Sequence, residues 1–226
     1  MKTTVSPRVL WLDNFRSLSV YMMILFHFTY DLTIFHLIEL DMNQGFWFYF
    51  PRFIAGSFLF CVGASLEQSS LNVLNFKKML PRLFKIGIGA AIVSLLTWFF
   101  YKNYWIYFGT LHCIFFASLF GYFLIRKPLL QLILFLVITV LQWIFHFDVK
   151  WVSSLINRPS MDFIPIYPWM NWVLLGMLVG PLINKYYPTI GTMSRWWILP
   201  GQYSFSIYLI HQPLIFGILS LVKMLG

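Results

Sequence analysis

Charged residues are scarce in this sequence. Only 10% of its 226 residues are Asp, Glu, Lys or Arg, and 60% are hydrophobic. A soluble domain usually carries about a quarter charged residues and under half apolar ones. A single soluble core of this length has too little interior to bury so much apolar surface. The composition therefore excludes an ordinary soluble protein and predicts an integral membrane protein.

Cysteine and the motifs of common enzymes are also scarce. Cys61 and Cys113 both lie inside apolar runs, so there is no disulfide framework and no CxxC pair. P-loop, GxGxxG and GxSxG motifs are missing. No two histidines are spaced i, i+4, and no cysteine accompanies them in a ligand pattern, so we expect no metal. Without a basic-aromatic module, the net charge of +9 does not indicate a nucleic-acid partner.

Long apolar runs, in contrast, are abundant. About 20 apolar residues in a helix cross the hydrocarbon core of a bilayer. Seven stretches qualify: 15–35, 47–66, 83–101, 106–125, 129–147, 166–184 and 203–222. We predict an all-α, polytopic protein with one integral membrane domain over residues 1–226, surrounded by lipid. Pro213 lies inside the last stretch and is expected to kink it.

Lysine and arginine are distributed unevenly between the two sets of helix ends. Five lie at one set, namely Arg52, Lys102, Lys150, Arg158 and Lys223. Eleven lie at the other, namely Lys2, Arg8, Arg16, Lys77, Lys78, Arg82, Lys85, Arg126, Lys127, Lys185 and Arg195. The positive-inside rule therefore predicts a cytoplasmic N-terminus.

Ionisable residues within the first stretch indicate a site. His27 and Asp31 are four residues apart and share one helix face. Arg16 lies eleven residues before His27, about three turns away and on nearly the same stripe. A carboxylate near an imidazole orients it and raises its basicity, which suits proton transfer. The alternative is an interhelical hydrogen bond that only fixes packing.

Two further histidines lie in apolar stretches. His112 is expected in the outer third of its helix, at a depth similar to that of His27, and is either a site residue or a structural hydrogen-bonding group. His211 shares a polar stripe with Ser204 and Tyr208, at spacings i, i+4 and i+7. That stripe marks His211 as a candidate site residue, with Ser204 and Tyr208 as candidate binding residues.

Two charged residues at outer helix ends are candidates for substrate binding. Arg52 either extends its side chain to the membrane surface or holds an anionic group in an outer cavity. Asp162, in the longest outer loop, either lines the mouth of a pocket or is a turn residue.

Five segments of the sequence carry a family resemblance. They are 8–19 (RVLWLDNFRSLS), 25–32 (LFHFTYDL), 58–66 (FLFCVGASL), 167–180 (YPWMNWVLLGMLVG) and 203–213 (YSFSIYLIHQP). Together they resemble bacterial membrane proteins related to the heparan-α-glucosaminide N-acetyltransferase catalytic domain. The sequence departs from the family pattern at Ser17, where the family usually has Gly after the arginine that corresponds to Arg16.

The resemblance implies acyl transfer across the inner, cytoplasmic membrane of a bacterial cell. Cytoplasmic acetyl-CoA would be the co-substrate, and an amine or hydroxyl of an extracytoplasmic sugar or glycan would be the acceptor. His27, oriented by Asp31, would be the general base or the nucleophile, with His112 or His211 assisting. The alternatives are a proton-coupled transporter of small solutes and a non-catalytic membrane scaffold. The sequence leaves open whether the chain forms a homo-oligomer.

Overall fold

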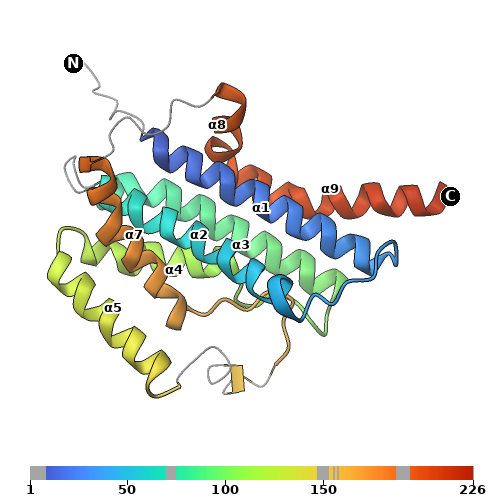
Figure 1. Ribbon diagram of the computed structural model, residues 1–226, viewed down its shortest axis with the longest axis horizontal. Helices are drawn as coiled ribbons and strands as arrows, with labels where there is room; N and C mark the ends of the chain where they lie inside the picture. Colours follow the sequence, from blue (N-terminus) through green and yellow to red (C-terminus); the bar gives the residue numbers. More distant parts are fainter. Residues whose placement is uncertain are drawn as a thin grey trace. The chain divides into compact units, whose positions relative to one another are not determined.

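The computed structural model describes residues 9–69, 75–146, 153, 154, 156, 158–186 and 194–225. These residues are mostly α-helical (Figure 1). The helices are α1 (Leu10–Ile34), α2 (Gly45–Ser69), α3 (Phe76–Phe100), α4 (Thr110–Leu124), α5 (Pro128–Trp143), α7 (Ile166–Tyr186), α8 (Arg195–Gln202) and α9 (Ser204–Leu225). Within the described ranges the only β-bridge is an isolated one between Phe108 and Phe163. The predicted all-α class is confirmed.

Each of the seven predicted stretches lies on one helix, with ends that differ by up to seven residues. Five helices, α1, α2, α3, α7 and α9, are long and apolar enough to cross a membrane. The helices α4 and α5 have 15 and 16 residues, which gives lengths of about 22–24 Å. A hydrocarbon core is about 30 Å thick. Seven spans and a cytoplasmic N-terminus therefore stay predictions.

One helix, α8, was not anticipated from the sequence. Its eight residues include Pro200 and are much less apolar than the spanning stretches. The positive-inside prediction used three residues that lie outside the described part of the chain, namely Lys2, Arg8 and Lys150.

The chain divides into two compact units, each of which is described by itself. The first contains α2 from Leu59 onward, α3, α4, α5 and α7. The second contains α1, α2 up to Phe58, α8 and α9. That residues 1–226 form a single domain stays a prediction.

In the second unit, α1 packs against both α8 and α9. Met23 of α1 is buried with Phe50 and Ile54 of α2, and Ile207 and Tyr208 of α9 pack against this cluster. These apolar contacts fix the faces that α1 and α9 turn toward each other.

Ser17, the departure from the family pattern, joins α1 to α8. Its side chain has no exposed surface. The hydroxyl donates to the Ile198 carbonyl at 3.3 Å and accepts the Gly201 N–H at 2.8 Å. The serine therefore satisfies two backbone groups of α8 that glycine at this position would leave without a side-chain partner.

In the first unit, α2 and α7 approach so closely that their backbones touch. A Cβ atom at Gly176 would lie 2.1 Å from the Phe60 carbonyl oxygen, and one at Gly63 would lie 1.9 Å from that of Val173. Small residues let membrane helices pack at this distance. The close approach of α2 and α7 therefore requires glycine at both positions.

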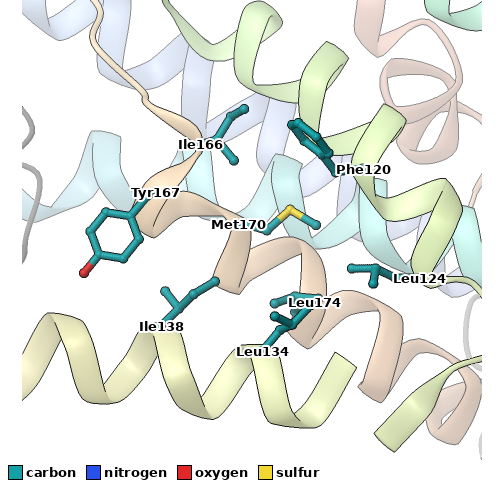
Figure 2. A pocket seen from close by; sticks show the side chains of 8 residues that line it. All are labelled: Phe120, Leu124, Leu134, Ile138, Ile166, Tyr167, Met170 and Leu174. Atoms are coloured by element: carbon teal, nitrogen blue, oxygen red, sulfur yellow. The ribbon is translucent and has the colours of Figure 1, made fainter. Parts of the chain in front are cut away.

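The first unit also has an apolar cleft of about 200 Å³ between α4, α5 and α7 (Figure 2). Its lining residues are Phe120, Leu124, Leu134, Ile138, Ile166, Tyr167, Met170 and Leu174. The hydroxyl of Tyr167 points away from the other labelled side chains (Figure 2). The described residues that line this cleft therefore present no polar group to it.

Candidate functional site

His27 lies on α1 in a defined tautomer. Its Nδ1 atom is 2.9 Å from the Met23 carbonyl oxygen, one turn earlier. A carbonyl oxygen only accepts hydrogen bonds, so Nδ1 carries the proton. Nε2 therefore holds a lone pair, and no described residue hydrogen-bonds to it. The backbone of α1 presents His27 as a base.

His211 on α9 is held in the same way. Its Nδ1 atom is 2.8 Å from the Tyr208 carbonyl oxygen and 3.1 Å from that of Ile207. The side chain is 8% exposed, and its buried Nε2 atom has no hydrogen-bond partner within the described part of the chain. A buried polar atom without a partner is uncommon in folded proteins. Nε2 of His211 is thus a second available lone pair.

The two imidazoles lie next to each other. Their ring centroids are 4.7 Å apart, and the ring planes meet at 84°. The packing of α1 against α9 produces this pair. The second unit therefore brings together two of the histidines selected from the sequence.

Asp31 does not hold the partner that its spacing predicts. Its fully buried carboxylate accepts hydrogen bonds from Nε2 of Gln212, at 2.9 Å to Oδ1 and 3.2 Å to Oδ2. His27 is oriented by the Met23 carbonyl instead. The structure thus corrects the expected His27–Asp31 hydrogen bond, because the carbonyl four residues earlier is within reach of Nδ1.

Gln212 is a site residue that the sequence reasoning missed. The one signal was a polar side chain in the apolar last stretch, beside His211. Neighbouring helix positions point about 100° apart, so the stripe containing His211 does not include Gln212. Contact with Asp31 required α9 to pack on α1.

The other two residues of the predicted polar stripe on α9, Tyr208 and Ser204, lie at different distances from the histidine pair. The ring of Tyr208 lies 5.9 Å from that of His211 and packs on the apolar cluster around Met23. Ser204 is the first residue of α9. Seven residues separate it from His211, about 10 Å along the helix axis. Tyr208 therefore adjoins the histidine pair, and Ser204 does not.

Arg16 and Arg52, the two arginines selected from the sequence, each contact a residue of their own helix. Arg16 donates to Oδ1 of the buried Asp13 at 3.1 Å, and it lies about 16 Å along α1 from His27. The guanidinium of Arg52 lies 3.7 Å from the centre of the Phe48 ring and donates to the Phe48 carbonyl. Both contacts are within the arginine's own helix.

His112, in the first unit, uses both ring nitrogens to hold the start of α4. Nδ1 accepts the Gly109 N–H at 3.2 Å, so the proton lies on Nε2. Nε2 donates to Oγ of Ser94 at 3.1 Å, and Ser94 donates to the Ile106 carbonyl at 2.6 Å. This network leaves His112 without an available lone pair.

Asp162 supports the same helix start. Its Oδ2 atom accepts the N–H of Thr110 at 2.8 Å and the Thr110 hydroxyl at 3.0 Å. Burial raises the pKa of the Asp162 carboxyl above its ordinary value, against the opposing effect of these hydrogen bonds. The contacts are those of a helix-capping residue.

The prediction that His112 shares a layer with His27 stays a prediction, because the two residues belong to separately described units. Among the described residues, no group of three or more His, Cys, Asp or Glu side chains is arranged to hold a metal ion.

The apolar helices indicate a membrane protein, and the buried polar cluster on α1 and α9 contains two of its histidines. Residues 8–213 match the model of the family described as heparan-alpha-glucosaminide N-acetyltransferase, catalytic. The chain belongs to this family, and the match includes the whole cluster from His27 to Gln212. The family indicates a membrane-bound acyltransferase. No curated protein and no solved structure matches the chain.

Proposed function

We propose that this protein moves an acetyl group from cytoplasmic acetyl-CoA to an amine or hydroxyl of an extracytoplasmic sugar or glycan, with His27 as the general base. The observation that carries the proposal is the lone pair on Nε2 of His27, held in place by the Met23 carbonyl. Membership of the acetyltransferase family supports the reaction class.

The chemistry needs one base that later acts as an acid. The acceptor X–H gives its proton to Nε2 of His27, and X attacks the carbonyl carbon of the thioester. The C–S bond breaks, and the thiolate takes the proton from Nε2, giving acetyl-X and free CoA. In the alternative two-step route, Nε2 itself attacks and carries the acetyl group. Both routes use the same lone pair.

One neighbour of His27, Asp31, suits the positive charge that forms on the imidazole during transfer. The ring of His211 packs edge-on against that of His27, with the two centroids 4.7 Å apart. The buried Asp31 lies one turn along the same face, and a carboxylate stabilises a nearby imidazolium in a low-dielectric site. His112 has neither nitrogen available, which favours a structural role at the start of α4.

Binding of the donor is assigned to cations at the helix ends that we predict to be cytoplasmic. The candidates are Arg16, Arg82, Lys85, Arg126 and Lys127. Guanidinium and ammonium groups bind the phosphates of CoA through charge-assisted hydrogen bonds. Within the described part of the chain, Arg52 contacts Phe48 and Asp162 holds Thr110 at the start of α4, and these contacts support structural roles for both residues.

The test is His27→Gln in purified protein, with acetyl-CoA as donor, glucosamine as acceptor and release of the CoA thiol as the readout. Loss of a general base typically lowers turnover by about 10² to 10⁴-fold. The matched control is His36→Asn, at an exposed turn residue two positions after the end of α1. His36 has a positive φ of 58°, which asparagine tolerates. Wild-type turnover in His27→Gln would refute the proposed role.

Two further measurements separate the alternatives. Radiolabelled acetyl that stays on the wild-type protein without acceptor, and is lost in His27→Gln, indicates the two-step route. Solute flux in liposomes without consumption of acetyl-CoA indicates the proton-coupled transporter.

A further inference from the structure

Gln212 has one satisfied end and one unsatisfied end. Its Nε2 atom donates to both carboxylate oxygens of Asp31. Because a carboxylate accepts hydrogen bonds, the amide nitrogen must face Asp31, and the carbonyl oxygen Oε1 must face elsewhere. Oε1 is buried, and no described residue hydrogen-bonds to it.

An unsatisfied buried acceptor is energetically unfavourable. Leaving one such group without a partner costs about 1–3 kcal/mol. The same applies to the buried Nε2 of His211, on the neighbouring residue of α9. Two consecutive residues of α9 therefore carry this penalty, and a ligand that donates hydrogen bonds to them would remove it.

The two unsatisfied atoms belong to one cluster with α1. His211 contacts His27 through their rings, and Gln212 contacts Asp31 through hydrogen bonds. His27 and Asp31 are one turn apart on a single face. Among the described residues of this cluster, Nε2 of His27, Nε2 of His211 and Oε1 of Gln212 are acceptor atoms without a hydrogen-bond partner. A ligand that satisfies these acceptors must supply N–H or O–H donors.

We propose that Gln212 binds the acyl acceptor: Oε1 receives a hydrogen bond from its amine or hydroxyl group, while Nε2 of the same side chain holds Asp31. This inference rests on the proposed function and adds a substrate-binding residue to it. The thioester carbonyl of the donor offers only an acceptor atom, so Oε1 does not bind it. The affected substrate is therefore the sugar.

The first experiment is Gln212→Met, which keeps the side-chain length and removes both polar atoms. Loss of one hydrogen bond to the acceptor raises the KM for glucosamine by roughly three- to tenfold, with the KM for acetyl-CoA unchanged. The matched control is Gln131→Met on α5. Gln131 is also a buried glutamine, but it donates to Glu67 and to the Leu124 carbonyl. This control is expected to lower stability and to leave both KM values as in the wild type.

A double-mutant cycle separates direct binding from an effect through Asp31. In the Asp31→Asn background no buried carboxylate is left unpaired when Gln212 is replaced. If Gln212→Met still weakens glucosamine binding there, Oε1 contacts the acceptor. If the loss disappears, Gln212 is only a positioning residue for Asp31, and the proposal is overturned.

Glucosamine affinity is measured by calorimetry on the purified protein as well as by turnover, so inactive variants remain informative. If Gln212→Met does not purify as folded protein, Gln212→Glu in the Asp31→Asn background replaces it, because Glu keeps an acceptor oxygen at that position and there faces an amide instead of a second carboxylate. Glucosamine affinity within threefold of that of Asp31→Asn is then expected, and a tenfold loss overturns the inference. Failure of the wild type to use acetyl-CoA would instead count against the proposed function, since binding of glucosamine is measured without the donor.

Discussion

The contact between α2 and α7 in the first unit should not tolerate a side chain at Gly176. In Gly176→Ala the new Cβ atom would lie 2.1 Å from the Phe60 carbonyl oxygen and 2.9 Å from the Ala64 backbone nitrogen. Ordinary contact begins at 3.4 Å, so the helices must separate locally by about 1.3 Å. Both obstacles are backbone atoms, which cannot rotate away as a side chain does.

The magnitude follows from two opposing effects. Overpacking a well-packed interface typically costs about 1–3 kcal/mol, and occasionally more. Replacing Gly by Ala inside a helix contributes about 1 kcal/mol in the other direction. Because the clash is with rigid backbone on two sides, we expect the upper part of that range and a net loss of about 2 kcal/mol.

The assay is unfolding of the purified protein by heat and by SDS, followed by loss of helical circular dichroism. The matched control is Gly217→Ala on α9, where a Cβ atom meets nothing within 4 Å. This control is expected to keep or slightly increase stability. Equal stability of Gly176→Ala and Gly217→Ala would refute the close backbone approach of α2 and α7.

Two other predictions concern helix junctions. Ser17→Ala leaves the Gly201 N–H without its side-chain partner and is expected to lower the free energy of unfolding by about 1–3 kcal/mol. Ser206→Ala, at an exposed position of α9, is the control in the same unfolding assay. Equal stabilities of the two variants would contradict the hydrogen-bonded contact between α1 and α8. Asp162→Asn is expected to flatten the dependence of stability on pH. The raised pKa of Asp162 means that its folded form binds the proton more tightly, so its contribution to stability is greatest below the ordinary value of 3.8 and declines as pH rises toward the folded value. Thermal midpoints measured from pH 4 to 7 check this, and identical slopes in the variant and the wild type would count against it.

The sequence predicted the helices well because the signals for them are local. A run of about 20 apolar residues has to satisfy its backbone groups within itself when lipid surrounds it. Each of the seven predicted stretches accordingly lies on a helix. The short helix α8 escaped because its residues are not apolar enough to register as a span, and Pro200 lies inside it.

The candidate site was predicted only in part. His27 and His211 were selected because ionisable groups within apolar runs need a reason to be there. Their pairing, and the hydrogen bond between Asp31 and Gln212 across 181 residues of sequence, follow from how α9 is rotated against α1. Helical spacing alone instead suggested that the Asp31 carboxylate orients the His27 imidazole.

The sequence by itself determined that this chain is a helical membrane protein of the acetyltransferase family, since apolar length and local motifs require no knowledge of packing. The tertiary structure decided which polar atoms remain available. His112 is engaged at the start of α4, whereas His27 and His211 keep their Nε2 lone pairs. The physical reason is that the partner of a buried polar group is set by the rotation and distance of neighbouring helices, and neither quantity is contained in the spacing of residues along one helix.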